Sequence, residues 1–294
     1  MATRVAFIGL GVMGYPMAGH LLRNGCEVVV FNRSSSRATQ WVSEYGGRAA
    51  SSPAEAAREA DVVLACVGRD ADVAEVTRGA SGAFKTMRPG TVFVDHTTAS
   101  AKLARDLAAA AEFAGFGFID APVSGGELGA NKGQLTVMCG GQRTNYDKAE
   151  PVIRAYAKQC RLIGEAGSGQ LTKMVNQICI AGVVQALAEG LSFARAAGLD
   201  AAAVIEVISK GAAQSWQMEN RYKTMLGGQF EHGFAVQWMR KDLSICLDEA
   251  RSNGASLPVA ALVDQFYAEV ENMGGHRWDT SSLFARTERA RKNP

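Results

Sequence analysis

The sequence predicts an α/β fold of two domains, and two observations lead to this prediction. Short apolar runs alternate with helix-like segments up to about residue 163, and this alternation is typical of a doubly wound sheet of parallel strands. From Gly164 onward the chain contains only long helical segments. We therefore predict a doubly wound N-terminal domain over residues 1–163 and an all-helical C-terminal domain over residues 164–294.

The chain begins with the pattern strand, glycine loop, helix, strand. An apolar run at 4–8 leads into Gly9-Leu10-Gly11-Val12-Met13-Gly14, and a second apolar run at 26–31 follows about one helix length later. In this βαβ context, G-x-G-x-x-G is the fingerprint of a Rossmann domain that binds a dinucleotide. Gly9 would make the tight turn, Gly11 would let a pyrophosphate approach the backbone, and Gly14 would let the helix pack on the strand.

The residues after the second strand indicate which dinucleotide binds. NAD-binding units usually have an Asp or Glu here for the ribose 2′-hydroxyl, whereas this chain reads Asn32-Arg33-Ser34. An arginine suits a 2′-phosphate, because its guanidinium makes charge-assisted hydrogen bonds to phosphate oxygens. We therefore expect NADP, with NADPH preferred and NAD possible.

The remaining elements of the first domain continue the alternation. We predict helices at 35–46, 53–59, 70–78 and 100–114, and strands at 48–50, 61–67, 91–94, 117–119, 134–140 and 160–163, with a helix between the last two. Ligands of open α/β sheets bind beyond the carboxyl ends of the strands. Three such ends are of interest here: Val67, a candidate cofactor contact, the segment Asp95-His96-Thr97-Thr98, and the segment Asp120–Gly126.

The second domain is predicted to contain six helices, at 169–197, 201–210, 214–225, 238–253, 258–273 and 281–291. The glycine-rich stretch Gly164–Gly169 is the expected hinge between the domains. We expect the chemistry in the crevice between them, because ligand sites often lie at domain interfaces.

One face of the first long helix carries an ammonium group and two amides. Lys173, Asn176 and Gln177 stand at positions i, i+3 and i+4. A helix N-terminus and an apolar cleft would both favour the neutral amine, so Lys173 could donate and accept a proton near neutral pH. On these residues alone, a solvated surface lysine is an equally good interpretation.

Two further segments could contact a substrate. The loop Pro122–Gly126 contains two glycines and could close its backbone around a carboxylate, although an ordinary surface turn has the same composition. Phe234 and Trp238 precede the charged pair Lys241-Asp242 on a predicted helix, and core packing explains these aromatic residues equally well.

Composition excludes several functional classes. The formal net charge is +2 with both signs interspersed, so the chain lacks the electrostatic footprint of a nucleic-acid or anionic-membrane partner. No secretory signal opens the chain, and six cysteines without a C-x-x-C pair indicate a reducing, cytoplasmic setting. The four histidines have no metal-ligand spacing and no G-x-S-x-G elbow is present, so we expect no metal site.

The motifs together resemble the β-hydroxyacid dehydrogenases, the group that includes 3-hydroxyisobutyrate dehydrogenase, tartronate semialdehyde reductase and the glyoxylate and succinic semialdehyde reductases. Four segments spread over nearly the whole chain carry the resemblance: Gly9–Gly14, Asp120–Gly133, Gly167–Asn176 and Lys241-Asp242-Leu243. The resemblance implies that Lys173 is the catalytic acid/base.

The resemblance also implies roles for other residues. Ser124, Gly125 and Gly126 would hold the substrate carboxylate, Asn176 would orient the substrate, and Thr98 and Lys241 would contact the cofactor. This chain departs from the family pattern at two positions, because Thr97 replaces the usual serine and Gln177 stands where a second asparagine is common. Substrate selection would depend on the pocket around three aromatic residues: Trp216, Phe234 and Trp238.

The resulting hypothesis is an NADPH-preferring reductase of a short semialdehyde or 2-oxo acid, such as succinic semialdehyde or glyoxylate. The same site run in reverse would oxidise a β-hydroxy acid such as 3-hydroxyisobutyrate. Imine reductases are similar in fold and fingerprint but usually lack the lysine, and a non-catalytic nucleotide-sensing protein is the third hypothesis.

A homo-oligomer, dimer or tetramer, is expected from the family and from apolar residues of the long helix. These residues could instead fill the core of their own domain: Ile178, Ile180, Val183, Val184 and Leu187.

Overall fold

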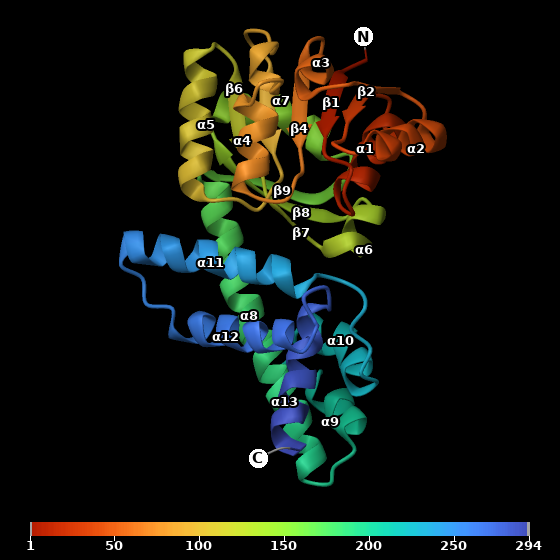
Figure 1. Ribbon diagram of the computed structural model, residues 1–294, viewed down its shortest axis with the longest axis vertical. Coiled ribbons are helices and arrows are strands. Elements are labelled where there is room, and N and C mark those ends of the chain that lie inside the picture. Colours follow the sequence, from red (N-terminus) through yellow and green to blue (C-terminus); the bar gives the residue numbers. More distant parts are fainter. Residues whose placement is uncertain (1, 293–294) are drawn as a thin grey trace. The chain divides into compact units, whose positions relative to one another are not determined.

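The structure is a computed structural model that describes residues 2–292 (Figure 1). The chain forms two compact units, Met1–Lys173 and Met174–Pro294. The division lies within helix α8 (Ser168–Ala196), later than the predicted boundary after residue 163. The reason is that the first turn of α8 is hydrogen-bonded to the sheet of the first unit.

The first unit contains a parallel-rich Rossmann sheet, which confirms the predicted fold class. Within the described residues, its strands run in the order β3-β2-β1-β4-β5-β6-β8-β7, and β9 pairs with β8. Their bounds are β1 Arg4–Ile8, β2 Glu27–Phe31, β3 Arg48–Ala49, β4 Val62–Ala65, β5 Val92–Asp95, β6 Gly117–Asp120, β7 Val123–Ser124, β8 Leu135–Gly141 and β9 Ala157–Gly164.

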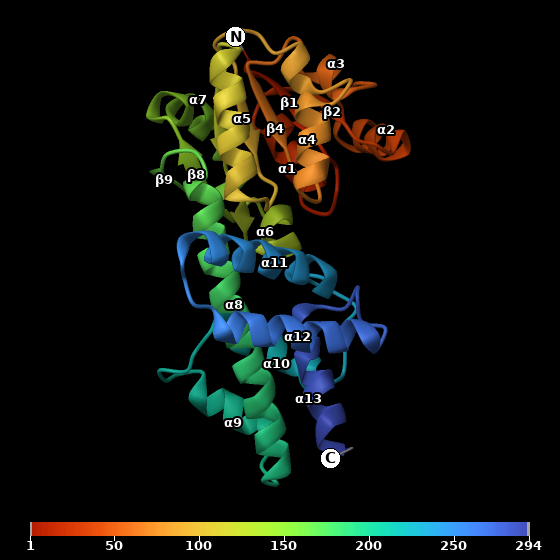
Figure 2. The same ribbon diagram turned by 60° about the vertical axis from the view of Figure 1, so that its left-hand side comes forward.

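Helices cover both faces of this sheet, so the unit has three layers. Figures 1 and 2 show α4 and α5 side by side on one face. The core on that face also includes residues of α3, whereas α1, α2 and α7 pack on the opposite face. The helices are α1 Gly14–Arg23, α2 Ser35–Tyr45, α3 Pro53–Ala57, α4 Asp70–Arg78, α5 Ala101–Phe113, α6 Gly126–Asn131 and α7 Arg143–Ile153, with a 3-10 turn at Ala83–Lys85.

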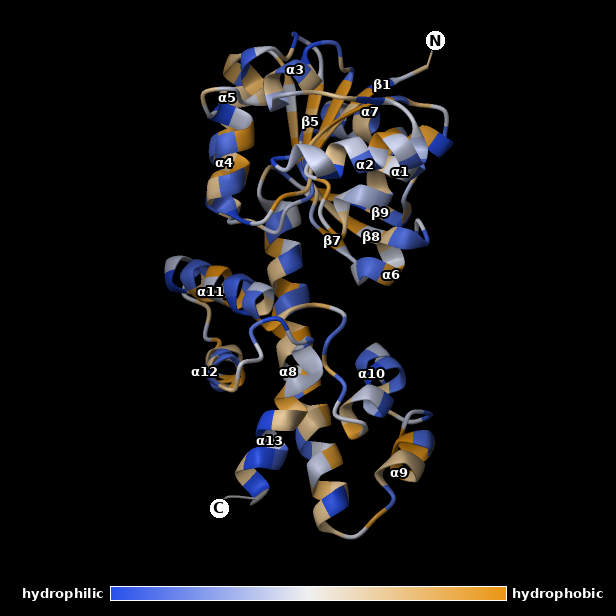
Figure 3. Ribbon diagram, turned by 45° about the vertical axis from the view of Figure 1, so that its right-hand side comes forward, coloured by the Kyte–Doolittle hydropathy of each residue, from blue (hydrophilic) through white to orange (hydrophobic). Residues whose placement is uncertain are grey.

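Both faces of the central strands are buried, as expected where helices cover a parallel sheet. In β1, Val5 and Phe7 belong to the core beneath α1 and α2, and Ala6 and Ile8 belong to the core beneath α4 and α5. Figure 3 shows the central strands, such as β5, as hydrophobic and the helices with mixed surfaces. This double burial explains why the strands appear in the sequence as continuous apolar runs.

The far edge of the sheet differs from a purely parallel arrangement. Strand β8 runs antiparallel to β6 and β7 and parallel to β9. The short strand β7 and helix α6 occupy a region predicted as a loop. The topological switch point lies between β1 and β4, where the chain turns from one half of the sheet to the other, and ligands bind there in doubly wound folds.

The second unit is built of helices, as predicted. Besides the rest of α8, it contains α9 Ala201–Ile208, α10 Trp216–Leu226, α11 Val236–Asn253, α12 Pro258–Asn272 and α13 Leu283–Lys292, with a 3-10 turn at Thr280–Ser282. Val184 and Leu187 lie in its core, so these two residues do not contribute to a surplus apolar surface, whereas Val183 is exposed. By length and composition α8 could cross a membrane, although a single such helix is weak evidence for a span, and half of its most apolar window is buried inside the structure.

Candidate functional site

The glycine loop after β1 has the geometry that a dinucleotide requires. Gly9 has φ +96°, and a Cβ there would lie 2.3 Å from the Cys66 carbonyl oxygen. A Cβ at Gly14 would lie 2.0 Å from the Gly9 oxygen, whereas a Cβ at Gly11 would have no atom within 4 Å. Gly9 and Gly14 therefore permit close packing, and Gly11 leaves open space. Helix α1 has no side-chain cap and no acidic residue in its first turn, so its N-terminus can accept the pyrophosphate of a dinucleotide.

Other predicted cofactor residues lie around this loop. Leu10 is buried and its N–H donates to Asn32 Oδ1 over 2.9 Å, so the Asn32 side chain holds the loop. Arg33 is different, because its side chain is 95% exposed and its nearest carboxylate, that of Asp72, is 3.8 Å away. A weakly paired, exposed guanidinium can turn toward a phosphate. The remaining residues of this set are exposed Val12, partly buried Met13 and Ser34, the N-cap residue of α2.

The loops that follow β4 and β5 are joined by Thr97. Its Oγ1 accepts from the Val67 N–H over 3.0 Å, and its own N–H donates to Asp95 Oδ1 over 3.0 Å. The predicted cofactor residue Thr98 follows and is partly buried. Thr97 therefore takes a structural position at the centre of this loop cluster, and Thr98 is the residue with access to solvent.

Asp95 gives this cluster a measurable pH dependence. Burial raises the pKa of its carboxyl to about 7, although hydrogen bonds from Thr97 favour the charged form. The unfolded chain ionises near the ordinary pKa of 3.8, so between these values the folded protein binds more protons. The free energy of unfolding should therefore decrease as the pH rises from about 4 to about 7. Asp95→Asn should reduce this decrease, by an amount on the order of a few kcal/mol.

Urea unfolding of the wild type and of Asp95→Asn at several pH values between 4 and 8 measures the effect. Asp106→Asn is the control, because the exposed Asp106 is bonded to Lys102, which lowers the pKa of its carboxyl below this window. The control should keep the wild-type slope. An Asp95→Asn variant with the wild-type slope would contradict the assignment of a protonated Asp95 at pH 5 to 6.

The first turn of α8, which carries Lys173 further along, is attached to the sheet by a buried carboxylate. Asp120, at the end of β6, accepts from the Gly167 and Gln170 N–H groups, each over 2.8 Å. Burial raises the pKa of Asp120 to about 6, while these backbone hydrogen bonds oppose the shift. A Cβ at Gly169 would lie 2.5 Å from the Asp120 carbonyl oxygen, so only glycine allows this approach. Lys173 follows one helical turn later and is 7% exposed.

The predicted carboxylate loop connects β7 to α6. Ser124 belongs to β7 and pairs with Thr136 of β8, and Gly125 and Gly126 have φ values of +130° and +59°. The predicted loop is therefore a short strand followed by a turn that requires glycine. Its hydroxyl and backbone N–H groups are the kind of donors that bind a carboxylate.

A buried histidine supports the residues that precede this loop in the chain. His96 Nδ1 donates to the Ala121 carbonyl oxygen over 2.7 Å, and the Tyr156 hydroxyl donates to Nε2 over 2.7 Å. The acceptor at Ala121 fixes the tautomer, because a carbonyl cannot donate. Burial lowers the pKa of His96 to about 4, so the ring is neutral at physiological pH. Both ring nitrogens are therefore engaged in hydrogen bonds that link the loop after β5 to Ala121 and Tyr156.

In the second unit, the two amides that follow Lys173 are part of a polar network. Asn176 Nδ2 donates to Gln177 Oε1 over 2.8 Å, and Gln177 Nε2 donates to Asp242 Oδ2 over 2.6 Å. Lys241 Nζ lies 2.9 Å from Asp242 Oδ1. The structure thus brings three predicted site residues together around the buried Asp242. The longer amide of Gln177 reaches this carboxylate on α11.

The three predicted aromatic residues divide into two groups. Trp216 and Phe234 are linked, because the Arg221 guanidinium lies 5.0 Å from the Trp216 ring and pairs with Asp279, which accepts from the Phe234 N–H. Trp238 lies on α11, with Lys241 Nζ 6.0 Å from its ring. Trp216 is half-exposed, so these aromatics are not simply core residues.

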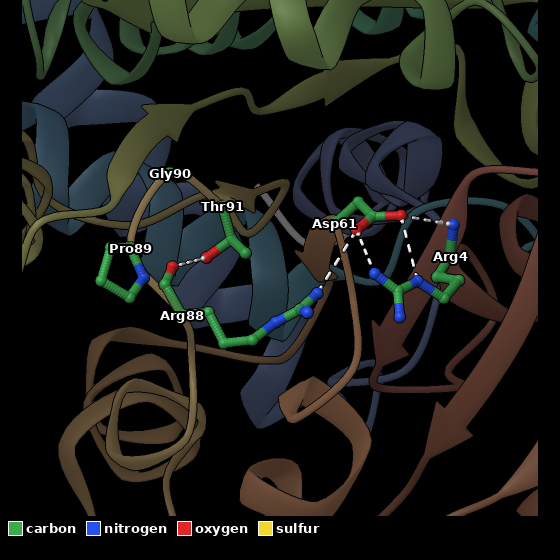
Figure 4. Close-up of a pocket in the computed structure, with 6 residues that line it drawn as sticks. All are labelled: Arg4, Asp61, Arg88, Pro89, Gly90 and Thr91. Atoms are coloured by element: carbon green, nitrogen blue, oxygen red, sulfur yellow. Dashed lines mark hydrogen bonds and ion pairs between the residues drawn. The ribbon is translucent and has the colours of Figure 1, made fainter.

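A pocket of about 310 Å³ at the opposite edge of the sheet offers no comparable chemistry (Figure 4). Its residues lie at the amino ends of β1, β4 and β5, where Arg4 and Arg88 both bind the Asp61 carboxylate, over 2.8 and 3.3 Å. These cations are already neutralised by a common partner. These ion pairs therefore connect the starts of the three strands, and we assign no ligand to the pocket. Within residues 2–292, no cluster of three or more His, Cys, Asp or Glu side chains could hold a metal.

Comparison with known proteins identifies the family. A protein-family model described as the NAD binding domain of 6-phosphogluconate dehydrogenase matches residues 4–164. A model described as the NAD-binding of NADP-dependent 3-hydroxyisobutyrate dehydrogenase matches residues 167–286. The chain is 41% identical to the probable 3-hydroxyisobutyrate dehydrogenase-like 1, mitochondrial, of Arabidopsis thaliana, over 98% of this chain and 86% of that protein. This chain belongs to the β-hydroxyacid dehydrogenase family.

Further similarities agree with this placement among the β-hydroxyacid dehydrogenases. An uncharacterized oxidoreductase of Shewanella frigidimarina is 62% identical over 98% of this chain and 99% of its own length. The solved structure of Mycobacterium tuberculosis 3-hydroxyisobutyrate dehydrogenase with L-serine superposes with a TM-score of 0.87 at 30% identity, covering 97% of this chain and 99% of that one. The protein is therefore an NAD(P)-dependent oxidoreductase of this family.

Four residues of these networks had no role predicted from the sequence, although all four lie in segments that the sequence singled out: His96, Asp120, Gln170 and Asp242. Asp120, Gln170 and Asp242 connect the predicted site residues, and His96 supports the substrate loop. The strand-end positions of Asp120 and His96 singled out their segments, but they do not indicate that these two side chains support the site through buried hydrogen bonds. Gln170 and Asp242 act through contacts across 71 and 65 residues of sequence, for which the local pattern contains no signal.

Proposed function

We propose that this β-hydroxyacid dehydrogenase is an NADPH-preferring reductase of short semialdehydes or 2-oxo acids, such as succinic semialdehyde or glyoxylate. In the reverse direction it would oxidise a β-hydroxy acid such as 3-hydroxyisobutyrate. We further propose a soluble, cytoplasmic enzyme, in line with the six free cysteines, and a homo-oligomer, dimer or tetramer, by analogy with the family.

The observation that carries this proposal is the attachment of the Lys173 helix to the sheet. Asp120 and Gln170 hold the start of α8 against the loops that follow β5 and β6. These loops lie at the carboxyl edge of the sheet, as does the glycine loop, and this is the edge where doubly wound folds bind dinucleotides. A proton-carrying side chain fixed to that edge suits a reaction at the reactive end of the cofactor.

The residues of the first unit fit a nicotinamide dinucleotide. The space above Gly11 and the uncapped start of α1 suit the pyrophosphate. Arg33 would neutralise a 2′-phosphate, and Thr98 would contact the nicotinamide end. When bound in its reduced form, the cofactor supplies a hydride to the substrate carbonyl. NADPH is preferred to NADH in this proposal because of Arg33 alone.

The chain's own contribution to the chemistry is a proton and a fixed geometry. Lys173 Nζ would donate a proton to the carbonyl oxygen as negative charge develops on it, and would take the proton back when an alcohol is oxidised. Ser124, Gly125 and Gly126 would hold the substrate carboxylate, and Asn176, on the next turn of α8, would orient the carbonyl. Positioning of this kind supplies much of the rate enhancement.

In the second unit, substrate would also contact one amide and three aromatic residues, namely Gln177, Trp216, Phe234 and Trp238. Lys241 would contact the cofactor. For Gln177, the bond to Asp242 supports a role in fixing its neighbour Asn176. For the aromatic residues, partial exposure leaves surface for a ligand.

A steady-state screen tests the proposed function. We expect NADPH-dependent reduction of succinic semialdehyde or glyoxylate, and a fall in kcat/KM of about 100-fold for a methyl ester of the same semialdehyde, because the ester lacks the charge that the loop binds. The reverse assay uses 3-hydroxyisobutyrate and L-serine with NADP and NAD.

Two results would replace the proposal. Reduction of cyclic imines in preference to every carboxylate-bearing aldehyde would favour an imine reductase. Tight NADPH binding without turnover on any substrate would favour a nucleotide-sensing protein.

A further inference from the structure

Gln170 makes an unusual pair of contacts in the first turn of α8. It is 1% exposed, its Nε2 donates to the Thr97 carbonyl oxygen over 2.7 Å, and its Oε1 accepts from the Ala99 N–H over 3.0 Å. The two backbone groups flank Thr98. A single side chain therefore binds the loop on both sides of the residue proposed to meet the nicotinamide.

This arrangement requires a primary amide of this length. A carbonyl needs a donor and an N–H needs an acceptor, and an amide side chain supplies both in one plane without having to take up a proton. Ionised glutamate has no donor, and asparagine is one methylene shorter. Because both backbone groups are buried, losing either bond would leave an unsatisfied polar group in the interior.

The same residue is fixed from its other side. Its backbone N–H donates to Asp120, and a Cβ at Gly140 would lie 2.7 Å from both Asp120 Oδ1 and the Gly169 nitrogen, so the helix start packs against β8 too closely for any side chain at Gly140. Thr97 is likewise tied to Val67 and Asp95. Gln170 is thus a rigid connection between the loops after β4 and β5 and the helical turn that leads to Lys173.

We infer that Gln170 is a positioning residue, which holds Thr98 in register with Lys173 so that the nicotinamide and the proton donor meet the same carbonyl. The inference rests on the proposed function for the roles of Thr98 and Lys173. A misplacement of about 1 Å between reacting groups can cost about 100-fold in rate. A side chain that fixes this distance therefore affects the chemical step more than it affects binding, because the pyrophosphate end of the cofactor is held by the glycine loop.

The test compares Gln170→Met with Gln185→Met in the full-length protein. Methionine keeps most of the volume and removes both hydrogen bonds. Gln185 is the matched control, because it is a buried glutamine on the same helix whose side chain bonds within that helix, to Glu189 over 2.6 Å. Gln170→Glu is a second variant, since its carboxylate, when ionised, keeps the acceptor for Ala99 and has no donor for Thr97.

Three measurements are made on each variant. Hydrogen exchange of the Ala99 amide, without cofactor, reports the contact itself. Titration with NADPH gives the dissociation constant and the fluorescence lifetime of the bound nicotinamide. Turnover with NADPH and with NADPH deuterated at the transferred position gives kcat and the primary isotope effect.

For Gln170→Met we expect Ala99 to exchange at least about 10-fold faster and kcat to fall about 10- to 100-fold, with a larger isotope effect and an NADPH dissociation constant within about threefold of the wild type. For Gln170→Glu, the exchange rate and kcat should lie between those of the wild type and those of Gln170→Met. This variant replaces Gln170→Met in the comparison if the methionine variant does not fold. Gln185→Met should keep the wild-type kcat and isotope effect.

Faster exchange at Ala99 with wild-type kcat and isotope effect would overturn the inference. The inference would also be overturned if activity decreased only in proportion to the amount of folded protein and the isotope effect stayed unchanged. If the wild type reduces no substrate, the proposed function fails, and the fluorescence lifetime of bound NADPH then tests the inference about Gln170. A change of this lifetime in the Gln170 variants alone would support the role of Gln170 in positioning the Thr98 loop. An unchanged lifetime would refute it.

Discussion

Lys173→Ala should lower kcat by about 1,000-fold, and leave the NADPH dissociation constant within about threefold of the wild type. The ammonium would act only where charge develops on the substrate oxygen, so its loss raises the barrier of the chemical step. The dinucleotide is held mainly by the glycine loop and the start of α1, which this substitution does not touch. Stopped-flow reduction of the best aldehyde, together with NADPH fluorescence titration, separates the two quantities.

Two further variants sharpen this experiment. Lys173→Arg keeps the positive charge, but a guanidinium does not release its proton at accessible pH, so this variant should be nearly as inactive as the alanine variant. Lys158→Ala removes an exposed lysine of the same unit, on β9, and should retain full activity. If Lys173→Ala kept kcat within tenfold of the wild type, the acid/base role would have to move to another residue.

The fold of this protein could be predicted from the sequence because its central strands are buried on both faces. Segments such as Val62–Ala65 are fully apolar and follow helical segments at regular intervals, which indicates a parallel sheet. The edge of the sheet could not be predicted in this way. Strand β7 contains only two residues, Val123 and Ser124, and exists because it pairs with β8. The local sequence pattern around β7 does not indicate that β8 will be its partner.

The candidate site divides along the same line. The glycine loop and the Lys173 segment are local motifs, so their residues could be named from spacing. The networks that hold them are not local, since Gln170 bonds to Thr97 and Gln177 bonds to Asp242 across long stretches of chain. Asn32 has a contact that its position did not indicate. Its predicted cofactor contact stays a prediction, and in the structure its amide oxygen accepts from the Leu10 N–H, 22 residues earlier in the sequence.

Cofactor choice is the second property on which a single residue should have a large effect. Arg33→Asp should lower kcat/KM for NADPH by about 100-fold and change that for NADH by less than about threefold. The variant removes the cation that would bind the 2′-phosphate and adds a negative charge, while NADH has only a hydroxyl at that position. An aspartate can accept a hydrogen bond from this hydroxyl, as in NAD-binding units, so NADH use could even increase.

The local geometry makes the result interpretable, because the Arg33 side chain is 95% exposed and its ion pair with Asp72 is as long as 3.8 Å. Its removal should not destabilise the fold, since exposed ion pairs contribute little. Arg161→Asp, which makes the same charge change at an exposed position on β9, separates a specific contact from the overall field and should leave the NADPH to NADH ratio unchanged. The NADPH advantage of the wild type should also shrink at high ionic strength, because salt screens an exposed cation. An equal loss for both cofactors in Arg33→Asp would mean that Arg33 supports the loop rather than the phosphate, and that the preference for NADPH must come from another residue.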